Sequence, residues 1–203
     1  MSKSMWLICE CDVPGQFSGL GELVTAAKHV MPSRPRELTV VLLHPHPENF
    51  IDKLKEYGVD RILCVKTSAQ VLWNDGLQAR ILASLIKERS PDIVLFLATV
   101  RGRSVAPQAA ARIGTGLTAD CTSLELDEHG VLVQVRPAFG ENLLARIVCK
   151  NHRPQMATIR PGVYVRAIPA PLPVSCEVER LNHEHECMDE VVLIESIKQV
   201  SRQ

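Results

Sequence analysis

The chain has 203 residues, 46% of them hydrophobic, which allows one domain with an ordinary core that buries roughly 70% of the unfolded surface. Its 23 basic residues balance 23 acidic ones, so it lacks the long-range field that nucleic-acid and anionic-membrane binders use, and neither partner is expected. Seven cysteines, an odd number, and an opening stretch without a long apolar run predict a reduced, cytoplasmic protein.

Four short apolar runs in the first half predict strands buried on both faces, because polar residues do not interrupt them. They are Trp6–Cys9, Leu38–Leu43, Arg61–Val65 and Asp92–Leu97. The longest run, 93–98, is far shorter than the about 20 residues that cross a bilayer. Apolar residues three and four apart predict helices at 19–29, 48–57, 76–89 and 104–113. This alternation indicates a parallel sheet with right-handed crossovers and helices on both faces.

From about Gly114 the pattern changes to short strands joined by turns, which predicts a largely antiparallel second half. The expected strands are Leu124–Gly130, Val131–Arg136, Leu143–Cys149 and Gln155–Ile159, with late edge strands at Ser175–Arg180 and Glu190–Glu195. The proline-rich stretch 161–173 is expected to run over the surface, because proline cannot sit inside a sheet. The predicted fold class is α/β, with an open, mostly parallel core in residues 1–113 and an antiparallel extension in 114–203, forming a single domain over 1–203.

Two glycines after the first strand, Gly19 and Gly21, resemble a phosphate-binding turn at a helix N-terminus. The third glycine of the dinucleotide fingerprint is missing, so a structural turn is expected instead.

Cysteine and histidine residues gather near the end of the sequence, at Cys176, His183, His185 and Cys187. Their spacing does not match the paired turns of tetrahedral zinc sites, and no metal is expected. Cys9 and Cys11 are interpreted as packing residues that point to opposite faces of the first strand, and therefore as no redox pair. No nucleophile at a sharp turn is legible, so hydrolysis is not supported.

A turn with two arginines follows the fourth strand. Arg101 and Arg103 precede a helix for which Ser104 is a plausible cap, so positive charge and a helix N-terminus share one strand's carboxyl end. Open parallel sheets bind ligands at that edge, which favours an anionic ligand or an acidic partner group. Alternatively, the arginines have solvated heads, or polar residues of the next loop (Thr115, Thr118 and Asp120) satisfy them.

A second arginine pair lies in HRPQMATIRPG, residues 152–162. Each proline restricts the residue before it to extended conformations, so Arg153 and Arg160 are held in place while 155–159 runs as a strand.

Three blocks of the sequence together resemble one known family. GRSVAPQAAARIGTGLTADCTSLELD (102–127), VRPAFGENLLARIVC (135–149) and HRPQMATIRPG (152–162) are similar to the amino-terminal domain of the electron transfer flavoprotein alpha subunit. The resemblance implies a Rossmann-like domain, similar in fold to adenine-nucleotide hydrolases, that pairs with a beta subunit and helps to enclose FAD. The family's second domain, which supplies most FAD contacts, has no counterpart here, so a separate FAD-domain polypeptide is an expected partner. Acyl-CoA or other dehydrogenases are the expected electron donors. The sequence departs from the family pattern at Ser104 and Glu141.

The resemblance also implies a set of site residues, interpreted as scaffold around the subunit interface and the flavin side of the domain, with architecture favoured over direct flavin contact. They are Arg103, Thr118, Arg136, Asn142, Arg153, Gln155 and Arg160. No residue need act as acid, base or nucleophile, so the chain is expected to be a component of an electron carrier more than an enzyme. Two alternatives stay open at this point: a stand-alone adenine-nucleotide binder, and a non-redox subunit that docks through its antiparallel half.

Overall fold

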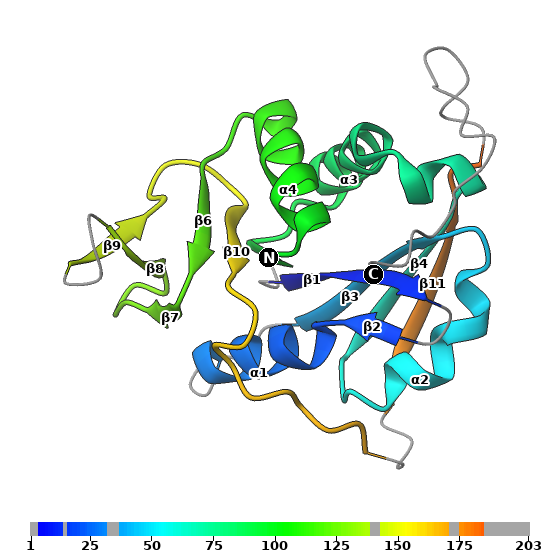
Figure 1. The fold of residues 1–203 in the computed structure, drawn as a ribbon, viewed down its shortest axis with the longest axis horizontal. Helices are drawn as coiled ribbons and strands as arrows, with labels where there is room; N and C mark the ends of the chain where they lie inside the picture. The colour runs from blue at the N-terminus through cyan, green and yellow to red at the C-terminus, as the bar shows by residue number, and fades with distance from the viewer. Residues whose placement is uncertain (1–3, 14–15, 32–36, 139–142, 171–174, 185–203) are drawn as a thin grey trace, which may run out of the picture.

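The computed structural model describes residues 4–13, 16–31, 37–138, 143–170 and 175–184. Figure 1 shows a central twisted sheet with two helices on each face and a small second sheet at one end. Within these residues, no helix is both long enough and apolar enough to cross a membrane.

The first half of the chain forms the strands that its apolar runs predict. They are β1 (Ser4–Val13), β3 (Glu37–His44), β4 (Arg61–Lys66) and β5 (Ile93–Leu97), and β1 pairs in parallel with both β3 and β5. A short strand, β2 (Gln16–Ser18), turns back antiparallel to β1. All five residues of β5 are buried, as expected for a strand covered on both faces.

The helices follow the predicted order, with shifted boundaries. They are α1 (Leu20–Val30), α2 (Ile51–Lys55) after the 3₁₀ turn η1 (Pro47–Phe50), α3 (Asp75–Arg89) after the 3₁₀ turn η2 (Ala69–Trp73), and α4 (Val100–Ile113). Two core clusters fill the two faces of the sheet, one under α1 and α2 and the other under α3 and α4. The prediction of Ser104 as the cap of α4 is wrong: Thr99 caps the helix, which therefore starts one turn earlier.

The second half contributes to both sheets. β7 (Ser123–Leu126), β8 (Leu132–Pro137) and β9 (Leu144–Val148) form the small antiparallel sheet. In contrast, β10 (Gln155–Ile159) lies parallel between β5 and a strand that was not predicted, β6 (Leu117–Cys121), and β11 (Glu177–Asn182) pairs parallel with β4. The main sheet thus has the order β11-β4-β3-β1-β5-β10-β6. The α/β fold class is confirmed, whereas the antiparallel extension is limited to β7–β9. The second predicted edge strand, 190–195, lies outside the described residues.

Cys9 and Cys11 lie on the same face of β1, so the prediction of opposite faces is wrong. Residues two apart on a strand share a face, and both cysteines belong to the core cluster under α1 and α2. Burial raises the pKa of Cys9 well above its ordinary value. Both therefore act as small packing residues, as the second part of that prediction states.

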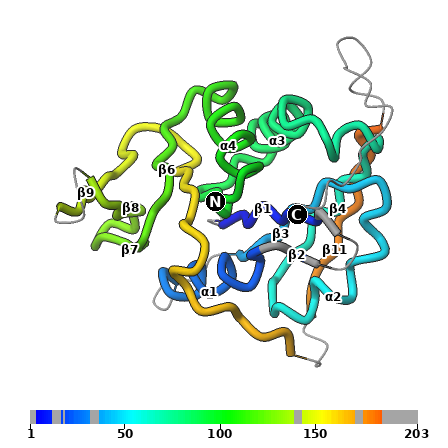
Figure 2. The backbone as a smooth tube through the Cα atoms, viewed as in Figure 1, coloured from blue at the N-terminus to red at the C-terminus, as the bar shows by residue number. Residues whose placement is uncertain are grey.

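The residues after β10 form an extended segment, 160–170, that we call the strap. Figure 2 traces it from β10 past α1 towards α2. The carboxylate of Glu22, 2% exposed, accepts hydrogen bonds from the Gly162 N–H (2.6 Å) and Arg166 Nε (3.2 Å). A Cβ at Gly21 would lie 2.8 Å from the Ala167 carbonyl oxygen, so this glycine allows the close approach of the strap. The described part of the proline-rich stretch therefore runs over the surface as predicted, and Gly21 has a structural role.

Candidate functional site

The carboxyl ends of the parallel strands form the edge at which open α/β sheets bind ligands. The strand order reverses at β1, because β3 and β4 continue to one side of it while β5, β10 and β6 lie on the other. The crevice between the ends of β1 and β5 is therefore the topological switch point. The turn with Arg101 and Arg103 follows β5 and opens helix α4 at this place.

A carboxylate of the chain itself occupies the helix end at the switch point. Glu10, near the end of β1 and only 9% exposed, accepts a hydrogen bond from the Thr99 hydroxyl, with oxygen distances of 2.8 and 2.9 Å. The Thr99 hydroxyl in turn accepts from the Gly102 N–H at 2.8 Å. A helix N-terminus favours negative charge, and the first turn of α4 contains no acidic residue of its own. The acidic group that the sequence led us to expect from a ligand or partner is thus supplied by Glu10.

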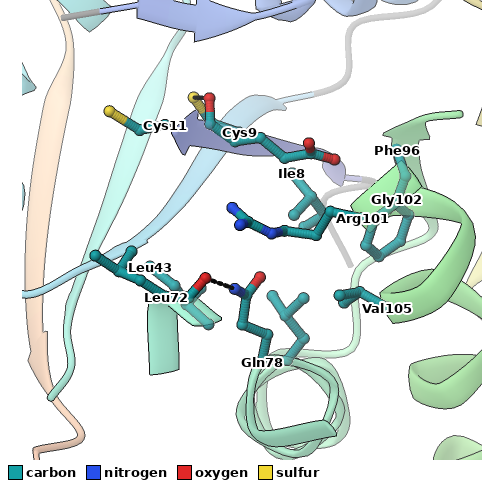
Figure 3. Close-up of a pocket in the computed structure, with 12 residues that line it drawn as sticks. Ile8, Cys9, Cys11, Leu43, Leu72, Gln78, Phe96, Arg101, Gly102 and Val105 are labelled. Carbon is teal, nitrogen blue, oxygen red and sulfur yellow. Dashed lines mark hydrogen bonds between the residues drawn. The ribbon is translucent and has the colours of Figure 1, made fainter. Parts of the chain in front are cut away.

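The remaining space in the crevice is filled by Arg101. Figure 3 shows its guanidinium group between the strand that carries Cys9 and the helix that carries Gln78. The side chain is 19% exposed, and its Nε lies 3.9 Å from the Asp75 carboxylate. The cavity between these groups has a volume of about 20 Å³, which is room for about one water molecule.

A second charged cluster lies where β6 and β10 end. Asp120 Oδ2 accepts from Arg160 Nη2 at 2.7 Å, and Asp120 Oδ1 lies 3.3 Å from Arg103 Nη2. Asp120 has φ of +62°, and the pairing of β6 with β10 is irregular at this point, so the local backbone directs its carboxylate to the arginines. The hydrogen bond from Arg160 is the main cause that lowers the pKa of Asp120, with the charges of Arg103 and Arg136 adding to it. Of the three residues that could satisfy the arginines, Asp120 does so.

This cluster predicts a measurable pH dependence of stability. Because its pKa in the folded chain is below the unfolded value of about 3.9, Asp120 stabilises the fold above that pH, and the contribution disappears as the pH falls through the lower folded value. Asp120→Asn, which tolerates the positive φ, is expected to be less stable at pH 7 by about 1 kcal/mol. The difference from the parent chain should vanish near pH 2 in chemical unfolding experiments. The matched change at the fully exposed Asp52 should show no such gap, and a gap at Asp120 that is constant from pH 7 to 2 would contradict the assignment.

The other predicted site residues lie away from this edge or are enclosed. Arg153 lies at the opposite, amino edge of the sheet, where its guanidinium donates to Asp92 Oδ1 (2.9 Å) and to the carbonyls of Cys149 (3.1 Å) and His152 (2.8 Å). Gln155 is fully buried, and its Oε1 accepts from the Leu132 N–H at 2.7 Å, which links the two sheets. Thr118 is buried in β6, and Asn142 lies outside the described residues. Arg136, on β8, donates to the neighbouring Pro137 carbonyl at 3.4 Å.

An open groove of about 650 Å³ lies beside α1, between the end of β5 and the strap. Its walls are mostly apolar and include Phe17 and Tyr57, whose rings meet edge to face with centroids 6.4 Å apart. Its volume is in the range of small-molecule sites, of the order of 300–1,000 Å³.

Cysteine and histidine chemistry receives no support from the described residues. Within them, no group of three or more His, Cys, Asp or Glu side chains is placed to hold a metal ion, and His185 and Cys187 lie outside them. Burial raises the pKa of Cys64 to about 11 and that of Cys121 to about 12, so both thiols stay protonated at neutral pH.

The small antiparallel sheet presents an apolar edge. β9 pairs only with β8 in the described part of the chain, and it lies at the end of that sheet. Four large apolar side chains, the first two 60% and 64% exposed, gather in and just before this strand: Leu143, Leu144, Ile147 and Val148. Ile147 and Leu144 point to opposite faces of the strand, so both faces and the free edge are accessible. Such an edge strand is typical of a surface that another chain covers.

The residues that sequence reasoning missed are Glu10 and the hydrogen-bonding role of Thr99. A possible signal for Glu10 was the acidic residue in ICEC, which interrupts an apolar strand at its carboxyl end. For a flavin, the half-exposed guanidinium groups of Arg103 and Arg160 fit an anionic pyrophosphate, whereas Thr118 and Gln155 are too buried to reach one. The chain therefore fits such a cofactor as one wall of a shared site, and the role of the individual residues stays a prediction.

Comparison with known proteins matches residues 6–185 to the electron transfer flavoprotein domain family. The chain is 41% identical to the electron transfer flavoprotein subunit alpha of Clostridium acetobutylicum, over 80% of this chain and 48% of that protein. It is 38% identical to the protein of the same name from Thermoanaerobacterium thermosaccharolyticum, over 82% and 50%. It is 30% identical to the acryloyl-CoA reductase electron transfer subunit beta of Anaerotignum propionicum, over 81% and 51%. The chain thus spans about half the length of these curated relatives.

Proposed function

The chain belongs to the electron transfer flavoprotein domain family, and from this membership we propose that it is an alpha-subunit-like domain that pairs with a beta-like subunit and helps to position FAD for electron transfer. A separate polypeptide supplies the second, FAD-binding half that the relatives contain in one chain. The electrons come from a dehydrogenase, such as an acyl-CoA dehydrogenase. Membership in the family supports an electron-transfer role, and the finer statements are the proposal.

The exposed strand β9 is the observation that carries the pairing with a beta-like subunit. Its four apolar side chains are too exposed to contribute to this chain's own core, and its free edge offers unpaired backbone groups. A partner that adds a strand or an apolar face here removes both liabilities at once. The balanced net charge agrees with a surface that binds through apolar contact more than through long-range attraction.

The contribution to the flavin is orientation and electrostatics. FAD supplies the electron chemistry when bound, while the protein sets its position and environment. Arg103 and Arg160, held by Asp120 at the carboxyl edge, offer fixed positive charge to an anionic part of the cofactor. The burial of Gln155 and the hydrogen bonds of Arg153 to backbone carbonyls support the architectural interpretation of those two residues.

Reconstitution from separate polypeptides tests this function. The chain, a beta-like subunit and an FAD-domain polypeptide are mixed with FAD, and complex formation, visible flavin absorption and reduction by a dehydrogenase are measured. We expect a yellow complex that accepts electrons only when all three polypeptides are present. A colourless complex would favour the non-redox interaction subunit, and equal electron transfer without the chain would overturn the proposal.

A further inference from the structure

The switch-point crevice of this domain is closed by its own charged side chains. We propose that Glu10 is the residue that decides ligand specificity here: its carboxylate replaces the phosphate of a nucleotide at the start of α4, and Arg101 replaces the remainder. In its native form the domain therefore excludes adenine nucleotides and other phosphate esters from the crevice. This inference concerns the chain itself and does not depend on the partners proposed above.

The position of the carboxylate supports the replacement. Open α/β folds hold a phosphate against backbone N–H groups at a helix N-terminus beside the switch point. Here Glu10 reaches the Gly102 N–H through one hydroxyl, that of Thr99, with each link between 2.8 and 2.9 Å. An added Cβ at Gly102 would lie 3.2 Å from Glu10 Oε1, so the carboxylate is in contact with the first turn of the helix. A phosphate at this place would meet both the atoms and the negative charge of Glu10.

The space supports it equally. The crevice retains about 20 Å³, whereas sites for small ligands usually have roughly 300–1,000 Å³. Arg101 extends across the opening towards Gln78, and apolar side chains of β1, β5 and α3 line the rest (Figure 3). Arg101 and Glu10 lie in the same crevice, so one fills the volume of a ligand while the other supplies its charge.

Nucleotide binding by two variants of the isolated chain tests the inference. Glu10→Gln removes the negative charge with little change of shape, and the double variant Glu10→Ser with Arg101→Ala also opens the space. Inorganic phosphate and AMP are titrated by calorimetry, and thermal unfolding with and without each ligand is recorded. We expect no saturable binding by the parent chain, phosphate binding by Glu10→Gln, and AMP binding by the double variant at least about tenfold tighter than any by the parent, the ratio that roughly 1.4 kcal/mol supplies.

Two controls make each outcome informative. Glu22→Gln removes another buried carboxylate, on α1 and away from the start of α4, and should bind neither probe. Arg101→Ala alone leaves the carboxylate in place and should also bind no AMP. If the double variant does not fold, the phosphate titration of Glu10→Gln decides. AMP binding by the parent chain in this crevice, or folded Glu10 variants that bind no better than the parent, would overturn the inference.

Discussion

Replacement of Gly102 by alanine is expected to lower the free energy of unfolding by about 3 kcal/mol, although alanine is the better helix former by about 1 kcal/mol. The added Cβ would lie 1.9 Å from the Leu97 carbonyl oxygen, which belongs to the backbone and cannot rotate away. Helix α4 would have to move off the end of β5, and this movement would strain the hydrogen bond between Gly102 and Thr99. The expected sign is therefore opposite to that of the intrinsic helix propensity.

Gly114→Ala provides the matched control for this prediction. Gly114 ends the same helix with φ of +74°, and an added Cβ there would meet nothing within 4 Å. Its replacement should reduce stability by about 1–2 kcal/mol through backbone strain alone. Urea unfolding monitored by circular dichroism measures both variants. A Gly102→Ala chain that is as stable as the parent, or no less stable than Gly114→Ala, would show that α4 can move away from β5 without loss.

The parallel core could be predicted from the sequence because its strands are continuous apolar runs. β3, β4 and β5 are buried on both faces, so no polar residue obscures their limits. β6 was missed because Thr118 and Asp120 make Leu117–Cys121 look like a loop, and it is a strand because β10 pairs with it. β10 itself was placed with the antiparallel strands because local sequence gives no information about which strands become neighbours.

The same limit applies to the candidate site. The arginine turn after β5 was predicted to lie at the carboxyl edge of the sheet, and it does. What these arginines contact depends on residues distant in the sequence: Asp120 meets Arg160 from 40 residues away, and Glu10 meets Thr99 from 89 residues away. Such pairs follow from the packing of the strands, so they become visible only once the fold is known.

The apolar strand β9 and the closed crevice together suggest how this domain divides work with its partners. The crevice, where this fold class usually binds a ligand, is filled by Arg101 and capped by Glu10. The accessible features lie instead on the small sheet, in the groove beside α1 and at the cluster of Asp120 with its two arginines. A domain of this kind contributes rigid surfaces to an assembly, and its stability resides in the core under those surfaces.

Substitution of both Leu144 and Ile147 by glutamate is expected to weaken binding to the beta-like subunit by about a hundredfold, close to 3 kcal/mol. Leu144 is 64% exposed and Ile147 faces the other side of β9, so the double change places a charge on each face that a partner would have to bury. The isolated chain should lose no more than about 0.5 kcal/mol per change, because neither residue belongs to its core.

Trp73→Glu is the control for the β9 variant, since it places the same charge on another exposed apolar residue, 52% accessible. Trp73 lies on η2, directly after β4, whereas the small sheet continues from β6 at the other end of the main sheet. Binding of the beta-like subunit is measured by calorimetry at a temperature where thermal melts show all variants folded. Selective loss of binding in the β9 variant supports β9 as the interface, because only the location of the charge differs. Unchanged binding, or an equal loss with Trp73→Glu, would place the partner elsewhere on the domain.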